Sequence, residues 1–270
     1  MFCNRLDTFK NEGSVMKYIS SICSDVGVKK AVNQDAVLVR QAVTGKGNIL
    51  FAAVCDGMGG LEKGELASSM VISKMSCWFE ETFPDILYHD FTPEGIEKSW
   101  KKEIYELNGE IYAYGETLDI RMGTTLTMLL LVEDTYYICN VGDSRIYYLK
   151  EKIQRMTHDQ SYVQHEIDMG RMTEEEALYS KQRNILLQCI GAGTMVSPDF
   201  YAGAYKSNSV FILCTDGFCH VITEQEIWNM LQPEALKDSK NMEEKIRQLV
   251  ETVKNRKEED NITVTLIHAV

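Results

Sequence analysis

The chain has 270 residues, with 28 Lys and Arg against 40 Asp and Glu, which gives a formal net charge of −12. Its 44% apolar and 25% charged residues are typical of a globular protein and exclude a disordered or fibrous one. The acidic balance argues against nucleic acid and anionic membranes as partners. No stretch reaches the roughly 20 apolar residues of a spanning helix, and the first fifteen residues lack an apolar leader, so we expect a cytoplasmic protein.

Short β-rich runs bounded by turn residues predict eight strands. In chain order they are Tyr18 to Ser24, Ala36 to Arg40, Ile49 to Cys55, Thr125 to Val132, Thr135 to Val141, Arg145 to Leu149, Val210 to Cys214 and Ile262 to His268. Helical periodicity predicts four helices, at about Glu62 to Glu81, Thr92 to Leu118, Thr223 to Leu231 and Asn241 to Val253. Thr223 and Glu226 form the pattern of a capping box at the start of the third helix.

The order of these elements predicts an α+β fold. The strands come in clusters with hairpin-length connections, which favours antiparallel sheets with helices outside and disfavours a doubly wound parallel sheet. A chain of this length can form one large domain or two small ones, and only 4 Pro argue against a long flexible linker. The polar segment from His158 to Gly193 lacks a strong strand signal, so we interpret residues 158–193 as an inserted, partly helical flap.

The eight cysteines show no Cys-x-x-Cys pair, and several lie in apolar runs: Cys3, Cys23, Cys55, Cys77, Cys139, Cys189, Cys214 and Cys219. We therefore predict buried, reduced thiols in preference to a disulfide framework or a zinc site.

Three aspartates share a local context at the boundary of a strongly apolar, strand-like run. They are Asp56 before Gly57, Asp216 before Gly217, and Asp260 before Asn261. Each alone fits an ordinary turn, because Asp-Gly and Asp-Asn are common turn pairs. Asp35 and Asp143 also lie at strand ends, so the acidic side chains outnumber what turns require. Carboxylates at buried strand ends need a partner, and a hard divalent cation such as Mg²⁺ or Mn²⁺ would suit them.

Seven ordered sequence blocks resemble those of the metal-dependent serine/threonine protein phosphatases of the 2C type, in their bacterial branch. The blocks are Ser24-Asp25-Val26-Gly27 with Asn33-Gln34-Asp35, Val54-Cys55-Asp56-Gly57-Met58-Gly59-Gly60, Gly64-Glu65-Leu66-Ala67-Ser68, Gly123-Thr124-Thr125, Val141-Gly142-Asp143-Ser144-Arg145, Cys214-Thr215-Asp216-Gly217, and Asp260-Asn261-Ile262-Thr263. The resemblance covers residues 18–270 as one catalytic domain and implies a four-layer α-β-β-α sandwich, two packed antiparallel sheets with helices on both outer faces. Residues 1–17 lie outside it, and we expect a tail without a catalytic role there, although Met16 is an alternative start.

The resemblance also implies a centre of two Mn²⁺ or Mg²⁺ ions. Asp56 would bridge both ions, with the Gly57 carbonyl on one and Asp216 and Asp260 on the other. Asp35 would hold metal-bound water. In such a centre a water between two cations loses its proton near neutral pH and attacks the phosphorus in line, so no covalent phosphoenzyme is needed.

Further expectations come from the bacterial members of the family. Asp143 would help Asp216 bind a third, weaker ion, and the flap would influence substrate choice. The substrates would be proteins carrying phosphoserine or phosphothreonine, with a Ser/Thr protein kinase acting in opposition. The sequence does not determine the oligomeric state, and our working expectation is a monomer.

The chain departs from the family pattern at three positions. Lys30 stands where an Arg usually grips the substrate phosphate through a bidentate fork, so Lys30 would bind phosphate as a point charge, with Lys29 beside it. Met58 replaces a His proposed as general acid in eukaryotic relatives, and Leu61 fills a position that is often His in bacterial ones. A metal-bound water would then protonate the leaving alkoxide.

Three other interpretations compete with this one. Cys139 and Arg145 formally match the Cys-x5-Arg loop of cysteine-dependent phosphatases, but Asp143 inside the loop would repel phosphate and a strand follows instead of a helix. A silent phosphoprotein-binding regulator with the same fold is the alternative that the Lys30 substitution motivates. Nucleotide-binding loops of the phosphate-cradling or dinucleotide type are lacking.

His158-Asp159 resembles a metal-binding pair, but a turn at the start of the flap is the better interpretation.

Overall fold

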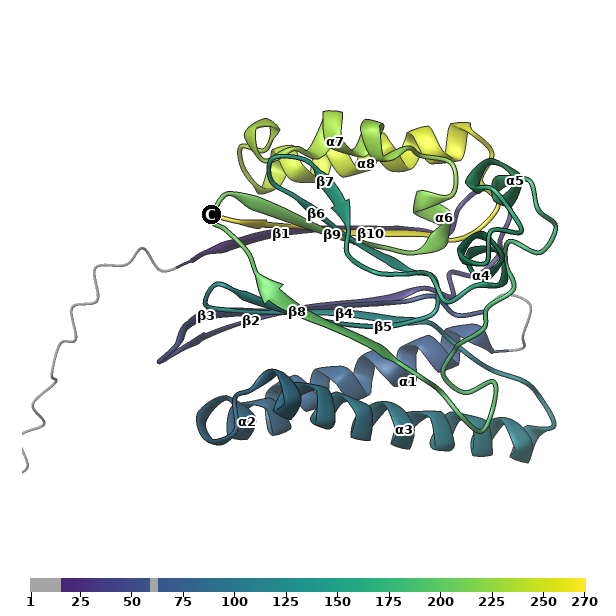
Figure 1. Ribbon diagram of the computed structural model, residues 1–270, viewed down its shortest axis with the longest axis horizontal. Coiled ribbons are helices and arrows are strands. Elements are labelled where there is room, and N and C mark those ends of the chain that lie inside the picture. Colours follow the sequence, from purple (N-terminus) through teal and green to yellow (C-terminus); the bar gives the residue numbers. More distant parts are fainter. Residues whose placement is uncertain (1–15, 59–62) are drawn as a thin grey trace, which may run out of the picture.

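Two five-stranded antiparallel sheets stack face to face in the computed structural model, which describes residues 16–58 and 63–270 (Figure 1). The first sheet has the order β1 (Tyr18–Asp25), β10 (Ile262–Ala269), β9 (Ser209–Cys214), β6 (Arg145–Leu149) and β7 (Ile153–Arg155). The second has the order β2 (Ala36–Thr44), β3 (Gly47–Cys55), β4 (Leu126–Val132), β5 (Thr135–Val141) and β8 (Asp199–Ala204).

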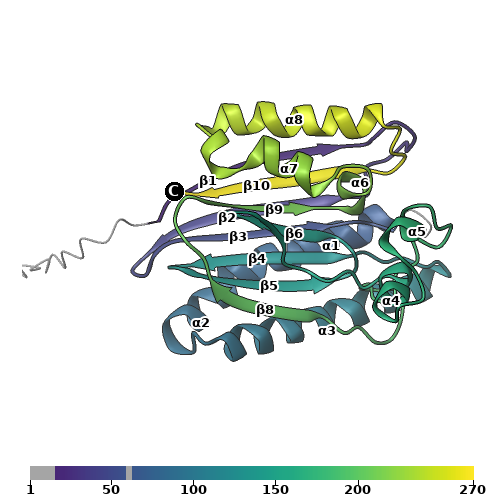
Figure 2. The same cartoon turned by 45° about the horizontal axis from the view of Figure 1, so that its top comes forward.

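Helices cover both outer faces of this pair of sheets, as Figures 1 and 2 show. The second sheet is covered by α1 (Gly64–Cys77), the π-helical turn η1 (Trp78–Thr82), α2 (Phe83–His89) and α3 (Pro93–Leu118). The first sheet is covered by α7 (Glu224–Leu231) and α8 (Ser239–Asn255), with the 3₁₀ turn η2 (Pro233–Ala235) between them. Three short helices, α4 (Tyr162–Asp168), α5 (Glu174–Leu178) and α6 (Asp216–Cys219), lie at one end of the sandwich. The four-layer fold predicted above is therefore confirmed.

The sheets are buried on both faces, which explains the continuous apolar runs in their central strands. In β3, Leu50, Ala52 and Val54 pack in the cluster between the two sheets. The alternate residues Phe51 and Ala53 belong to the cluster under α1 and α3. One face of β3 therefore stabilises the contact between the two sheets, and the other face stabilises the contact with the helices. Burial of each large apolar side chain contributes about 1.5 to 3 kcal/mol.

The predicted strands and helices all occur within the described residues, with shifted ends, but two strands were missed. The weak runs that form β7 and β8 carry little apolar periodicity and pair at sheet edges. The helix expected from Glu62 to Glu81 is interrupted by the π-helical turn, and Glu62 lies outside the described residues. The Thr223 capping box forms as predicted, and α4 and α5 make the segment 158–193 partly helical.

The described cysteines are all free thiols, and Cys55, Cys139, Cys214 and Cys219 are buried as predicted. Cys77 contradicts that prediction, because the last residue of α1 faces solvent. Cys3 lies outside the described residues. Among the helices in the described ranges, none combines the length and apolarity that crossing a bilayer requires.

Candidate active site

Strand register brings the predicted aspartates to one end of the sandwich. Ala36 pairs with Cys55 across β2 and β3, so Asp35 and Asp56 adjoin in neighbouring chain segments. In the first sheet, Val264 pairs with Cys214 across β10 and β9, which places the segments carrying Asp260 and Asp216 beside each other. The antiparallel pairing thus turns separate strand ends into one cluster of carboxylates.

The backbone around Asp56 is held by the Gly123-Thr124-Thr125 block. The amide of Asp56 donates to Thr125 Oγ1 over 2.9 Å, and the Asp56 carbonyl accepts from Thr124 Oγ1, also at 2.9 Å. Gly57 is required beside it, because an added Cβ would lie 2.4 Å from the Gly64 carbonyl oxygen. A side chain at Gly57 would therefore push apart the loops that form the cluster.

A hydrogen bond across the sheets joins the two halves of the cluster. Thr215 Oγ1 donates to Asp35 Oδ2 over 3.0 Å. Gly217, after Asp216, packs so closely that a Cβ there would lie 2.1 Å from the Asn261 carbonyl oxygen. Asp216 is consequently fixed between its own strand and the segment that enters β10.

The cluster has an excess of negative charge that raises the pKa values of its members. Burial, followed by repulsion from Asp35 and Asp216, raises the pKa of Asp56 well above its ordinary range. Burial and then Asp216 do the same for Asp143. Burial also raises the pKa of Asp35 to about 7, with Asp216 and Asp260 adding to the effect. Like charges gathered in this way favour either bound protons or a bound cation.

Asp216 behaves as the ionised partner in this cluster. Burial raises its pKa, but His220, a hydrogen bond with Asp56 and the Gly217 amide outweigh burial and lower the pKa below its ordinary value. The pKa values of Asp56 and Asp216 are thus shifted in opposite directions, upward for Asp56 and downward for Asp216.

The donor set fits a hard divalent cation. Asp35 Oδ1 and Asp216 Oδ1 are buried and have no hydrogen-bond partner in the described part of the chain. Carboxylate oxygens of this kind are ligands that Mg²⁺ and Mn²⁺ prefer. Across residues 16–58 and 63–270, however, no three His, Cys, Asp or Glu side chains already form a finished ligand group. Binding would thus draw the carboxylates together.

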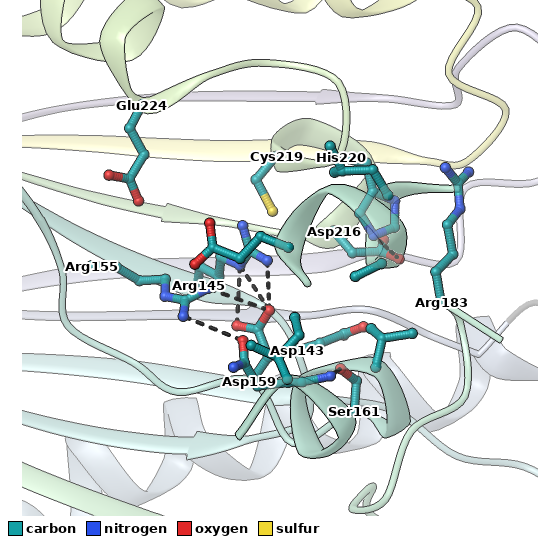
Figure 3. Close-up of a pocket in the computed structure, with 16 residues that line it drawn as sticks. Asp143, Arg145, Arg155, Asp159, Ser161, Arg183, Asp216, Cys219, His220 and Glu224 are labelled. Carbon is teal, nitrogen blue, oxygen red and sulfur yellow. Dashed lines mark hydrogen bonds and ion pairs between the residues drawn. The ribbon is translucent and has the colours of Figure 1, made fainter. Parts of the chain in front are cut away.

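A cavity of about 410 Å³ opens beside the cluster, with Asp143 and Asp216 in its wall (Figure 3). Asp159 on the same cavity is fully paired: it accepts from Arg145 Nε at 3.0 Å and from Arg145 Nη2 at 2.6 Å. Arg155 Nη1 lies 3.7 Å from Asp159 Oδ2. Asp159 is therefore a structural ion-pair partner.

The side chains of the adjacent residues His158 and Asp159 contact different partners. His158 Nε2 lies 2.8 Å from Asp168 Oδ2 in α4, whereas Asp159 turns to Arg145. The two side chains of the His158-Asp159 pair do not converge on one point, which agrees with a turn at the start of the flap.

Lys30 reaches the carboxylate cluster. Its Nζ lies 2.9 Å from Asp260 Oδ1. Burial lowers the pKa of Lys30, but the contact with Asp260 and the charges of Asp56 and Asp216 raise it above the ordinary value. Lys29 instead pairs with Glu259 at the surface. Only Lys30 of these two lysines therefore faces the carboxylates.

The loop that carries Lys30 is held in place by Asn261. Asn261 Nδ2 donates to the carbonyls of Val26 and Val32, at 3.0 and 3.1 Å. Its Oδ1 accepts from the Gln34 amide at 2.9 Å. The Asp260-Asn261 block thus supplies both a carboxylate and the anchor of the lysine loop.

The structure describes only the beginning of the Gly-rich segment that follows Asp56. The Met58 amide donates to the Gly123 carbonyl over 3.1 Å, which fixes the backbone after Gly57. Leu61 lies outside the described residues, as do Gly59 and Gly60.

Two side chains beside the cluster escaped the sequence analysis. His220 Nε2 lies 3.6 Å from Asp216 Oδ2, and His220 Nδ1 lies 3.9 Å from Glu258 Oε2. Glu258 is buried and accepts from the Glu259 amide at 2.9 Å. The spacing of four residues from Asp216 to His220 is the only local signal of this arrangement, and nothing in the sequence links either residue to Glu258.

The cysteine-dependent alternative is contradicted by the fold. Cys139 is buried in β5 within the cluster under the helices, and burial raises the pKa of its thiol well above the ordinary value. Arg145 is engaged with Asp159. The reactive thiolate and free guanidinium that such a loop requires are both missing at this pair.

A sequence profile described as protein phosphatase 2C matches residues 27–266 of the chain. The chain belongs to this family. It is 33% identical over 225 residues to the serine/threonine phosphatase stp of Listeria monocytogenes. The aligned residues make up 82% of this chain and 85% of the relative. The predicted family and the predicted protein serine/threonine phosphatase are confirmed by these matches.

Solved structures of similar proteins agree with the observed layers. Stp1 from Staphylococcus aureus superposes with a TM-score of 0.79 at 28% identity, over 93% of this chain and 94% of that one. The catalytic domain of PstP, solved in complex with two manganese ions, gives a TM-score of 0.76 at 27% identity, over 95% and 99%. Together with the carboxylate cluster, these likenesses support a metal-dependent phosphatase.

Proposed function

We propose that the protein hydrolyses phosphoserine and phosphothreonine in proteins with two Mn²⁺ or Mg²⁺ ions held at the carboxylate cluster. Asp56 would contact both ions, the Gly57 carbonyl one of them, and Asp216 and Asp260 the other. The observation that carries this proposal is the buried excess of carboxylates, two of whose oxygens lack partners in the described residues.

The remaining residues of the site have separate roles in this proposal. When bound, the ions supply an activated water as nucleophile and neutralise charge on the phosphoryl oxygens. Asp35, held by Thr215, would orient water at the centre. Asp143 would share a third, weaker ion with Asp216, since both line the cavity. Lys30 would attract the substrate phosphate as a point charge.

The wider setting follows from the same proposal. The substrates would be phosphorylated proteins, with a Ser/Thr kinase as the opposing enzyme and the cytoplasm as the compartment. Residues 158–193 would act as a flap that influences substrate choice, because α4 and α5 border the cavity beside Asp143 and Asp216. The catalytic domain would work as a monomer.

The direct test compares wild type with Asp216→Asn in hydrolysis of p-nitrophenyl phosphate and a phosphothreonine peptide, with Mn²⁺ or with EDTA. Asp85→Asn is the matched control, because Asp85 is an exposed aspartate in α2. We expect Mn²⁺-dependent activity in wild type and control, and a loss of about a thousandfold, near 4 kcal/mol, in Asp216→Asn.

Two results would contradict the proposal. Activity that resists EDTA would exclude the metal centre as the source of the nucleophile. No turnover with Mn²⁺, combined with retained binding of the phosphopeptide, would instead support the silent phosphoprotein-binding regulator.

A further inference from the structure

A buried polar side chain in the middle of α3 is paired with a loop that is distant in the sequence. Asn108 is 3% exposed and lies one turn after Ile104, on the buried face of the helix. Its Oδ1 accepts from the Gly191 amide at 2.8 Å, and its Nδ2 donates to the Gly193 carbonyl over 3.0 Å. Figure 1 shows the chain between α5 and β8 running down to α3. Asn108 therefore holds the end of the flap segment against this helix.

The helix alone does not require an asparagine at this position. Asn is a weaker helix former than Leu or Ala, and a buried amide group costs free energy unless it is hydrogen-bonded. The loop lies directly on the helix, because a Cβ added at Gly191, where φ is +93°, would lie 2.2 Å from Ile111 Cγ2. The two hydrogen bonds of Asn108 thus fix the position of the loop backbone on α3.

The loop continues into a small ladder of three segments beyond the end of the second sheet. Thr124 forms an antiparallel bridge with Ile190 on one side and with Gly57 on the other. The Thr124 amide donates to the Ile190 carbonyl over 3.0 Å, and the Ile190 amide donates to the Thr124 carbonyl over 2.9 Å. Because Ile190 directly precedes Gly191, Asn108 and Thr124 hold neighbouring residues of the same loop.

The middle segment of this ladder supports the backbone of the proposed metal centre. Thr124 Oγ1 donates to the Asp56 carbonyl over 2.9 Å. On the other side of Gly57, the Met58 amide donates to the Gly123 carbonyl over 3.1 Å. Gly57 thus lies between two residues whose backbone is held by residues 123 and 124. A shift of Thr124 would therefore be transmitted to the Gly57 carbonyl.

We propose that Asn108 is a positioning residue for the proposed metal centre. It fixes the loop against α3, the loop fixes Thr124, and Thr124 fixes the backbone of Asp56 and Gly57. This role rests on the proposed function, in which Asp56 and the Gly57 carbonyl bind the ions. Hydrogen-bonding residues that hold metal ligands in place alter metal affinity by about ten- to hundredfold when they are replaced.

The test measures Mn²⁺ binding by calorimetry in wild type and in Asn108→Ala. The variant leaves the Gly191 amide and the Gly193 carbonyl without their partner, so we expect the loop to loosen and the Kd for Mn²⁺ to rise about tenfold or more. Ile104→Val is the matched control, because it also weakens the buried face of α3 but leaves the loop contacts intact. Its Kd should equal that of wild type.

Three results would contradict the proposal in different ways. Equal affinities in wild type and Asn108→Ala would overturn it. An equal loss in Ile104→Val would also overturn it, because the effect would then come from destabilisation of α3 alone. No Mn²⁺ binding in wild type would overturn the metal centre itself, and the role of Asn108 with it, so the two failures are distinguishable.

A second measurement needs no variant and decides if Asn108→Ala fails to fold. Coupling between two sites is reciprocal, so bound Mn²⁺ must strengthen the contact between Asn108 and the Gly191 amide. Hydrogen exchange of wild type with Mn²⁺ or EDTA measures this effect. We expect the protection of the Gly191 amide to rise by about tenfold more than that of the Ile227 amide, which donates within α7. Equal gains at the two amides would overturn the proposal.

Discussion

Two groups of charges lie at the same end of the sandwich, and only one of them is balanced. Asp159 is neutralised by Arg145 through a two-pronged contact, with Arg155 nearby. Asp56 and Asp143, a short distance away, have mainly other carboxylates as charged neighbours, and burial together with that repulsion raises their pKa values. Asp159 therefore contributes to the stability of the fold. Buried carboxylates without a compensating cation destabilise a protein, so we interpret the second group as a ligand-binding one.

The balanced group should give the largest change in stability. Asp159→Ala leaves the half-buried Arg145 guanidinium without its partner, and we expect the free energy of unfolding to fall by about 3 to 5 kcal/mol. The loss should be the same with EDTA and with Mn²⁺, because the pair is not part of the metal centre. Chemical denaturation measures it. A change below about 1 kcal/mol would show that the pair is not the structural element described here.

The unbalanced group should make the metal-free protein sensitive to pH. The pKa of Asp35 is raised from 3.8 to about 7 in the folded state, so the folded state binds the proton more tightly than the unfolded state does. This contribution to stability is full below pH 4 and is lost as the pH rises through 7, on the order of a few kcal/mol. Denaturation in EDTA between pH 5 and 8 measures it. Stability that rises over this range would contradict the assignment.

Lys30 should give a smaller effect, confined to substrate binding. Lys30→Ala removes the cation that contacts Asp260, and we expect the KM for a phosphopeptide to rise about tenfold, near 1.4 kcal/mol, with little change in kcat. Lys29→Ala is the control and should leave KM unchanged, because Lys29 pairs with Glu259 at the surface. Lys30→Arg should retain binding. An unchanged KM in Lys30→Ala would remove Lys30 from the site.

The sequence predicts the two sheets, and it places the aspartates at the ends of their strands, because both signals are local. Apolar runs such as Ile49 to Cys55 predict a strand buried on both faces, and Asp56 follows that run directly. The edge strands β7 and β8 escape because their residues are only partly buried and lack strong alternation. Lys30 illustrates the intermediate case: a pattern predicts its place, but its partner Asp260 comes from the far end of the chain.

Contacts across the fold lie beyond what the sequence predicts. His220 and Glu258 meet near Asp216 only because α6 and the segment before β10 pack together. Tertiary packing decides such pairs, and residue patterns carry no signal for it.

The most direct test of the central claim is the thermal unfolding of wild type and Asp56→Asn, each with EDTA and with saturating Mn²⁺. Without metal, the variant removes one carboxylate from a repelling cluster, so we expect its Tm to exceed that of wild type. With Mn²⁺ the order should reverse, because wild type gains binding free energy that the variant has lost. The same order of Tm values in both conditions would contradict the claim that these carboxylates bind a divalent cation.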